Sequence, residues 1–256
     1  NIRDLVAGYG EIWSTRLYAA LLRERHARDP VLWVDARQVV VVEWGPLGPA
    51  VQWEESQANL ARVAPADFDG TLVITGFVAA DRRGIQTTLG RNGSDFSASV
   101  FGALLEAQEI VIWTDVDGVL SADPRRVPDA KVIDSLTYNE AMELAYFGAK
   151  VIHPQTMAPA VAREIPIWIR NTFNAEHPGT LICARSDSKP GRSSRRWTGT
   201  PCRRGSSIIS AMCRHPTNGR ASACSWRSCR TDRPATPSCV FARSRAASGN
   251  WPCRAR

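Results

Sequence analysis

The stretch Thr71-Leu72-Val73-Ile74-Thr75 is a short apolar run that ends at Gly76-Phe77, and it sets the pattern for most of the chain. A segment of helical character follows over residues 93–108, and a second apolar run occupies Ile110 to Trp113. Continuous apolar strands that alternate with helices are typical of a parallel sheet with both faces covered. The sequence therefore predicts an α/β protein, a three-layer α/β/α sandwich with a mainly parallel sheet.

The same alternation extends in both directions from this stretch. Apolar residues recur at helical spacing over about residues 11–28 and again near residues 141–145, where Gly148 is the expected helix end. The stripe of the first helix consists of Trp13, Leu17, Ala20 and Leu21. We expect further strands at residues 31–34, 39–42 and 165–169, and a Gly/Pro loop at residues 45–49.

Charge divides the chain into two parts. Residues 1–183 contain 16 Lys and Arg against 23 Asp and Glu, a net charge of −7, whereas residues 184–256 contain 16 against 2, a net charge of +14. The overall charge of +7 therefore describes the last part only, and it does not predict a nucleic-acid partner for the first. No run approaches the ~18 apolar residues of a membrane helix, so we expect a cytoplasmic protein without a membrane partner.

Residues 184–256 are poor in the residues that build a core. Their Leu, Ile, Val and Phe residues are only Ile208, Ile209, Val240 and Phe241. We therefore predict two regions, a folded domain at residues 1–183 and a disordered basic tail at residues 184–256. A basic nucleic-acid arm and a zinc module are alternatives, but 15 Arg against one Lys, and no Glu, favour an out-of-frame reading of a GC-rich gene.

A glycine-rich loop, Gly90-Arg91-Asn92-Gly93-Ser94-Asp95, follows the first apolar run and opens the helix at residue 93. Glycines let the backbone approach a ligand, and the N-terminus of a helix favours an anion. Arg91 adds a planar fork that suits a carboxylate or a phosphate. The alternative is a simple turn in which Ser94 or Asp95 caps the helix.

Polar residues also follow the second apolar run, from Thr114-Asp115 to Arg125. A calcium loop would need a bidentate Glu that this segment lacks, which leaves a polar turn or a nucleotide site at the carboxyl end of a strand. Lys150, one of two lysines in residues 1–183, lies just before His153-Pro154. It could supply the positive charge that phosphoryl transfer needs, or it could be an ordinary solvated Lys beside a structural or capping His.

In their order along the chain, these motifs resemble those of the aspartokinases, members of the amino-acid kinase family. The resemblance covers about residues 8–182 and is greatest to the kinase halves of bifunctional aspartokinases fused to homoserine dehydrogenase or diaminopimelate decarboxylase. The stretches that carry it are Gly10-Glu11, Asp35-Ala36-Arg37, Gly76-Phe77 and residues 90–98, 114–125, 140–144, 147–154 and 178–182.

The resemblance implies the amino-acid kinase fold and transfer of the ATP γ-phosphoryl group to the β-carboxylate of L-aspartate, with Mg²⁺ between the phosphates. It places Glu11 on the substrate ammonium, Arg91 on the α-carboxylate, and Asp95 and Lys150 at the reacting phosphoryl group. The residues implied to contact the nucleotide are Thr114, Asp115, Leu120, Arg125, Lys150 and Val151. It implies no protein-held metal, and a homo-oligomer for the complete enzyme.

Two departures from the family pattern concern the nucleotide. Leu120 stands where many aspartokinases have Tyr, which removes a stacking partner for adenine. The family's opening strand and its Lys-Phe-Gly-Gly-Thr-Ser type phosphate loop do not occur in this sequence, so we expect a fragment with little kinase activity and an unpaired strand edge in its sheet. The alternatives are another member of the superfamily, such as glutamate 5-kinase, acetylglutamate kinase or uridylate kinase, and a non-enzymatic basic protein that acts through its tail.

Overall fold

The structure is a computed structural model that describes residues 2–25, 29–46, 48–146, 153–185, 207–211 and 239–244. Its helices are α1 (Ile2–Arg25), the short 3-10 helix η1 (Ala36–Gln38), α2 (Trp53–Val63), α3 (Gly93–Leu104), α4 (Tyr138–Tyr146) and α5 (Pro154–Ala162). The strands are β1 (Val31–Val34), β2 (Val42–Gly45), β3 (Gly48–Val51), β4 (Gly70–Thr75), β5 (Val78–Ala80), β6 (Gln86–Thr88), β7 (Glu109–Thr114), β8 (Ser135–Thr137), β9 (Ile167–Asn171), β10 (Thr180–Cys183), β11 (Ser207–Ala211) and β12 (Cys239–Ser244). No helix in these ranges is long and apolar enough to cross a membrane.

The central sheet has eight strands in the order β1-β4-β12-β11-β7-β9-β10-β8. Strands β1 and β4, β11 and β7, β7 and β9, and β10 and β8 pair in parallel, whereas β12 is antiparallel to both of its neighbours and β9 is antiparallel to β10. Two hairpins, β2-β3 and β5-β6, lie outside this sheet. The mainly parallel sheet with covering helices is the expected fold class.

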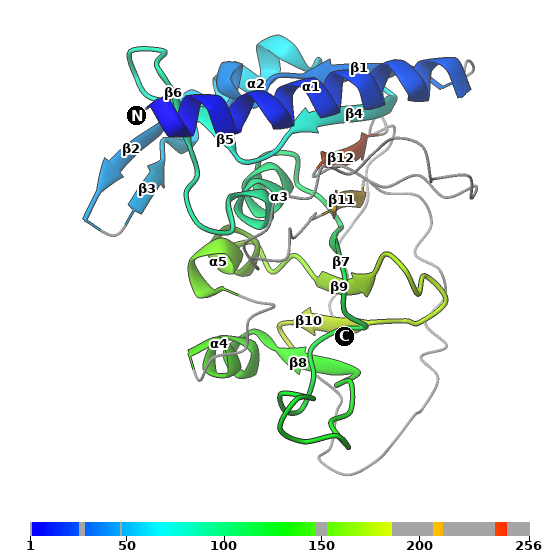
Figure 1. Cartoon of the computed structure of the whole chain (residues 1–256). Coiled ribbons are helices and arrows are strands. Elements are labelled where there is room, and N and C mark those ends of the chain that lie inside the picture. The colour runs from blue at the N-terminus through cyan, green and yellow to red at the C-terminus, as the bar shows by residue number, and fades with distance from the viewer. Residues whose placement is uncertain are drawn as a thin grey trace, which may run out of the picture.

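Helices cover both faces of the sheet, with α1 against β1 and β4, and α3 against β12, β11 and β7. Leu72 and Ile74 of β4 belong to the main core together with Phe101 of α3, whereas Thr75 contacts Thr15 of α1. Since successive side chains of a strand point to opposite faces, α1 and α3 lie on opposite faces of the sheet. Figure 1 shows α1 along the strands β1 and β4, and α3, α5 and α4 in a row beside the strands below them.

Most of the expected elements are present, with three differences in the first half of the chain. The first helix begins at Ile2 and not near residue 11, and its predicted stripe does not face the core, since Trp13 is 63 % exposed and Leu17 is 74 % exposed. Residues 39–41 connect η1 to β2 and are not a strand, although Val39 and Val40 are fully buried. Within the expected loop at residues 45–49, Gly45 is the last residue of β2 and Gly48 and Pro49 begin β3, with which β2 forms an antiparallel pair.

Two segments of the tail that we predicted to be disordered are strands in the structure, β11 and β12. Strands β11 and β12 lie between β4 and β7 and pair with them. We expected an unpaired strand edge in the sheet, but β4 and β7 are both paired here. These two strands contain all four Leu, Ile, Val and Phe residues of the predicted tail. Backbone groups in the middle of a sheet need partners, and the segments richest in strand-forming residues supply them. The rest of residues 186–256 lies outside the described residues.

Candidate functional site

The loop at the end of β4 holds the N-terminus of α3 in place. The backbone N–H of Phe77 donates to Ser97 Oγ at 2.8 Å, and Ser97 Oγ donates to the carbonyl of Gly93 at 2.8 Å. A Cβ atom on Gly93 would lie 2.7 Å from the Phe77 ring, so only glycine allows this close approach. The glycine-rich loop and the carboxyl end of β4 therefore form one unit.

Within this unit, Asp95 lies in the first turn of α3 and is only 3 % exposed. The residue that precedes α3 is Asn92, in a left-handed conformation and without a side-chain capping bond, so neither Ser94 nor Asp95 is the cap that our alternative proposed. A carboxylate in the first turn suits the positive end of the helix dipole. Asp95 thus places a buried carboxyl group at the N-terminus of α3.

Arg91, which is exposed, lines a cavity of about 220 Å³ beside this helix end. The cavity lies between the N-terminal parts of α3 and α5, and its other lining residues are Pro49, Leu89, Phe96, Gln155, Thr156 and Ala158. Both helix N-termini and the guanidinium favour an anion. The structure thus places Arg91 where a small carboxylate could bind.

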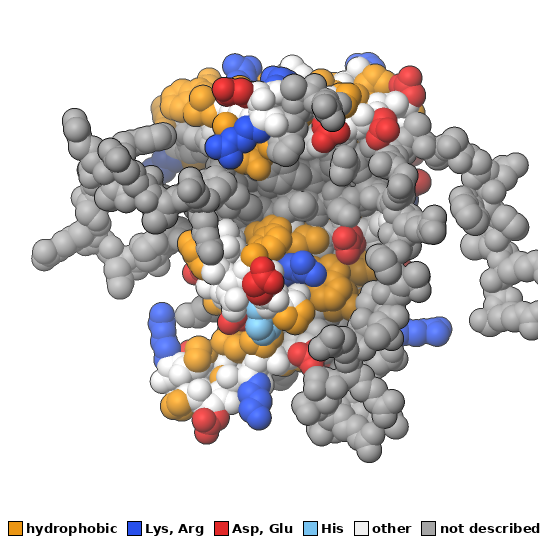
Figure 2. Space-filling view, turned by 90° about the vertical axis from the view of Figure 1, so that its right-hand side faces the viewer, with side chains coloured by type: hydrophobic (Ala, Val, Ile, Leu, Met, Phe, Trp, Pro, Cys, Tyr) orange, Lys and Arg blue, Asp and Glu red, His pale blue; other side chains and the backbone are white. Residues whose placement is uncertain are grey.

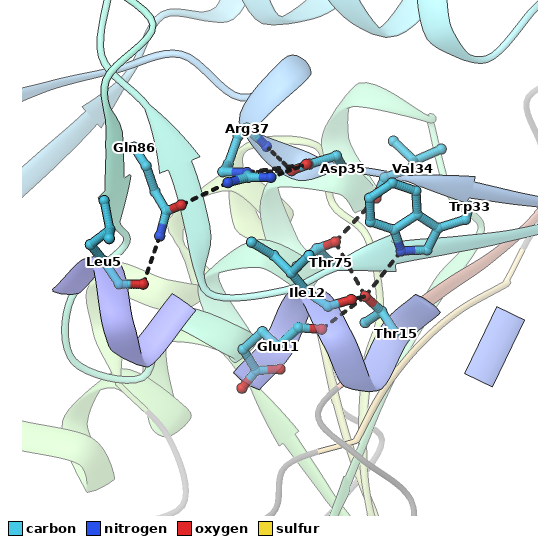
Figure 3. A network of polar contacts seen from close by, with 10 residues as sticks. All are labelled: Leu5, Glu11, Ile12, Thr15, Trp33, Val34, Asp35, Arg37, Thr75 and Gln86. Atoms are coloured by element: carbon cyan, nitrogen blue, oxygen red, sulfur yellow. Dashed lines mark hydrogen bonds and ion pairs between the residues drawn. The ribbon is translucent and has the colours of Figure 1, made fainter. Parts of the chain in front are cut away.

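Glu11 lies on α1 and is largely buried. Its Oε2 has no hydrogen-bond partner among the described residues, and no dashed line reaches its carboxylate in Figure 3. Burial raises the pKa of this carboxyl from 4.5 to about 7. A buried carboxylate with an unused oxygen is suited to a cationic partner such as an ammonium group.

The loops after β7 and β9 are fastened to each other. Thr172 N–H donates to the carbonyl of Thr114 at 2.8 Å, and Asp117 Oδ1 accepts from Asn171 Nδ2 at 2.8 Å and from Asn174 Nδ2 at 3.0 Å. These two amides hold the pKa of Asp117 below its usual range. The sequence analysis did not predict that Asn171 and Asn174 bind Asp117, although both follow shortly after the predicted strand at residues 165–169, where ligand-binding loops are expected.

A further contact fixes the turn at Gly118. The N–H of Val119 donates to Thr180 Oγ1 at 2.8 Å, and Gly118 has a φ of +145°. Within the loop, the hydroxyl of Thr114 donates to Asp115 Oδ1 at 3.1 Å. Thr114 and Asp115 therefore lie at the carboxyl end of β7, where the following loop is held by the contact between Val119 and Thr180.

Other predicted nucleotide residues lie farther along or outside the described ranges. Leu120 makes a backbone bridge with Val132, and Arg125, which is exposed, donates its N–H to Asp123 Oδ1 at 3.0 Å. Lys150 and Val151 lie outside the described residues. His153 precedes α5 but makes no side-chain capping bond, so the capping role that we considered for it is not observed.

Figure 2 shows the face on the right-hand side of Figure 1. Basic, acidic and apolar side chains of the described residues are interspersed there, without a continuous field of one charge sign. The described part of the chain contains no group of three or more His, Cys, Asp or Glu side chains that could hold a metal ion.

Comparison with known proteins identifies the family of this chain. The model of the amino acid kinase family matches residues 1–171. The chain is 44 % identical over 194 residues to the bifunctional aspartokinase/homoserine dehydrogenase 1 of Arabidopsis thaliana. The aligned region covers 75 % of this chain and 21 % of that protein. It is 37 % identical over 191 residues to the lysine-sensitive aspartokinase 3 of Escherichia coli, covering 74 % of this chain and 42 % of the relative.

Solved structures agree with these relatives. The structure of E. coli aspartokinase III in complex with aspartate and ADP matches with a TM-score of 0.64 and 35 % identity, over 72 % of this chain and 41 % of that one. The chain therefore spans between about a fifth and two fifths of the length of these proteins. The expected resemblance to aspartokinases is confirmed.

Proposed function

The chain belongs to the amino acid kinase family, and from this premise we propose that it is an aspartate kinase. The reaction transfers the γ-phosphoryl group of ATP to the β-carboxylate of L-aspartate and gives 4-phospho-L-aspartate and ADP. A bond forms between a carboxylate oxygen and the γ-phosphorus, and the bond from that phosphorus to the bridging oxygen of ADP breaks. Since the acceptor carboxylate is already ionised, the reaction needs no general base.

The buried carboxylate of Glu11 is the observation that carries this proposal. Its Oε2 lacks a partner among the described residues, and burial alone raises its pKa to about 7. An α-ammonium group of the substrate would supply the missing hydrogen-bond donor and favour the ionised carboxylate. A nucleotide acceptor such as UMP has no ammonium group to place there.

Arg91 supports the same substrate, because its positive charge suits the α-carboxylate of L-aspartate. It lines the cavity between α3 and α5, where its guanidinium can pair with the α-carboxylate of L-aspartate through two hydrogen bonds. With the ammonium on Glu11 and the α-carboxylate on Arg91, the β-carboxylate is left free to meet the phosphoryl group. Asp95, buried in the first turn of α3, would orient the charges around that group.

The nucleotide is proposed to bind at the loop after β7. Thr114 and Asp115 are joined by a hydrogen bond there, and Leu120 and Arg125 follow on the same loop. Leu120 offers apolar contact to the base where an aromatic ring would offer stacking. Lys150 and Val151, which the resemblance places on the nucleotide, belong to the proposal from the sequence alone.

Mg²⁺ is proposed to enter with the nucleotide. The donor chemistry fits this role, since Mg²⁺ in kinases is held by one or two carboxylates and the substrate phosphates, and Asp95 supplies a carboxyl group in the first turn of α3. Asp95 is the buried carboxylate that the resemblance puts nearest to the phosphates. When bound, the ion neutralises phosphate charge. A homo-oligomer and a cytoplasmic location belong to the same proposal.

Acceptor binding tests the proposal directly. The 256-residue chain would be titrated calorimetrically with L-aspartate, L-glutamate, N-acetyl-L-glutamate and UMP, each with and without Mg²⁺ and ADP. We expect L-aspartate to bind at least about tenfold more tightly than N-acetyl-L-glutamate and UMP, because these lack the ammonium group that Glu11 would bind. L-Glutamate has both charged groups but carries its side-chain carboxylate one methylene farther from Cα, so we expect it to bind more weakly than L-aspartate. Preference for any other acceptor, or no binding of L-aspartate, would contradict the assignment.

A further inference from the structure

Helix α1 is held to the sheet by a narrow contact face. Its buried positions are Gly8, Ile12, Thr15 and Ala19, of which only Ile12 is a large apolar residue. A Cβ atom on Gly8 would lie 2.7 Å from Val78 Cγ1, so the helix crosses the β5-β6 hairpin closely. Little apolar area is buried along this face, and polar contacts must therefore do more to fix where the helix lies.

The first set of polar contacts is centred on Thr15. Its hydroxyl donates to the carbonyl of Glu11 at 2.8 Å and accepts from the indole Nε1 of Trp33 at 3.0 Å. It also lies 3.4 Å from the hydroxyl of Thr75, the last residue of β4. Figure 3 shows these contacts joining the helical turn of Glu11 to β1 and β4.

The second set ties α1 near its beginning. Gln86 Nε2 donates to the carbonyl of Leu5 at 3.2 Å, and Gln86 Oε1 accepts from Arg37, which pairs with Asp35. This set lies between β6 and the first turns of α1, away from the turn that carries Glu11 (Figure 3). The two sets thus attach the helix at different points.

We propose that Trp33 and Thr15 are positioning residues for Glu11, which set the place of its carboxylate in the substrate site. The inference rests on the proposed function, in which Glu11 binds the α-ammonium of L-aspartate. Thr15 is fully buried and bonds the carbonyl of Glu11 itself, so a shift of Thr15 moves the Glu11 backbone with it. Trp33 fixes Thr15 from the neighbouring strand through the one hydrogen that its indole can donate.

The same contacts connect Glu11 to the other side of the site. Thr75 is followed by Gly76-Phe77, whose backbone holds the start of α3 through Ser97. The carboxyl end of β4 therefore holds both Glu11, through Thr15, and the glycine-rich loop that contains Arg91, through Ser97. A ligand with two charged groups at a fixed separation requires that its two binding residues be held at a fixed distance by the same rigid element.

The test compares three variants in titrations with L-aspartate and with ADP. Trp33→Phe keeps an aromatic ring but removes the N–H donor, and Thr15→Val removes the hydroxyl at nearly equal volume. For both we expect the Kd for L-aspartate to rise about three- to tenfold while the Kd for ADP changes less than about twofold. Thr15→Ser keeps the hydroxyl and should bind L-aspartate like the unchanged chain.

Gln86→Ala is the matched control, because it removes the hydrogen bond between Gln86 and the Leu5 carbonyl of α1, which is remote from Glu11. It should leave L-aspartate binding within about twofold, and circular dichroism would establish that every variant is folded. An unchanged Kd for L-aspartate in folded Trp33→Phe and Thr15→Val, or equal weakening by Gln86→Ala, would overturn the inference. If the unchanged chain does not bind L-aspartate at all, the proposed function fails first and the inference with it.

Discussion

Replacement of Glu11 by Gln should stabilise the ligand-free protein and at the same time weaken the binding of L-aspartate. The side chain keeps its size and loses only its ionisable group. Burial raises the pKa of Glu11 from 4.5 to about 7, so the folded state holds a proton that the unfolded state releases between these pH values. The contribution of Glu11 to stability is therefore fully present below pH 4.5 and is lost as the pH rises to about 7.

The size of the effect follows from the shift. A difference between 4.5 and about 7 at about 1.4 kcal/mol per unit corresponds to roughly 3 kcal/mol at pH 8, and the amide of Gln still needs partners, so we expect a gain of about 1–3 kcal/mol. Near pH 4 both side chains are uncharged and the two proteins should differ little. For L-aspartate, loss of a charge-assisted contact costs about 1.5–3 kcal/mol, more than tenfold in Kd.

The assay is urea denaturation of both proteins at pH 4 and pH 8, combined with calorimetric titration at pH 8. Comparing the variant with the unchanged chain at each pH cancels the other titrating groups. Glu143→Gln, the same chemical change at an exposed position of α4, is the control and should alter stability by less than about 0.5 kcal/mol. A stability difference that is equal at both pH values would refute the reasoning about burial.

Other substitutions test the remaining parts of the site. Arg91→Ala should raise the Kd for L-aspartate more than about tenfold and leave ADP nearly unaffected, whereas equal weakening of both ligands would assign Arg91 to the nucleotide or to the fold. Asn171→Ala removes a donor to Asp117 and should weaken ADP several-fold in the same titration without affecting L-aspartate; an unchanged Kd for ADP would separate this contact from nucleotide binding. Gly118→Ala should destabilise the protein by more than about 1 kcal/mol in thermal unfolding, because φ is +145° and the new Cβ would lie 2.4 Å from Thr180 Oγ1, and a wild-type midpoint would contradict the close packing there.

Local patterns were enough to predict the mainly parallel sheet and the glycine-rich loop before α3. The apolar runs at residues 71–75 and 110–113 became β4 and β7, because buried strands need continuous apolar side chains. The glycine-rich loop before α3 was recognisable, because glycine is needed where Gly90 adopts a φ of +74° and where Gly93 meets Phe77. Residue order alone also supported the resemblance to aspartokinases, which the relatives then confirmed.

Long-range contacts could not be predicted in this way. Asp117 meets Asn171 and Asn174, which lie 54 and 57 residues away, only because β7 and β9 are adjacent in the sheet. Helical spacing identified α1 but gave the wrong buried face, since Trp13 and Leu17 are exposed while Thr15 is buried against Trp33 and Thr75. Strands β11 and β12 were missed for the same reason, because their pairing with β7 and β4 is set by partners far away in the chain.

The sequence by itself determined which residues carry charge and where the chain turns, because these properties belong to single residues and their nearest neighbours. Only the tertiary structure decided that Glu11 is largely buried, with one oxygen that has no hydrogen-bond partner among the described residues, and that Arg91 borders a cavity between two helix ends. Burial and the distance between charges arise when segments far apart in the chain pack together. They set the pKa of Glu11 and the fit of a substrate, and no local pattern encodes them.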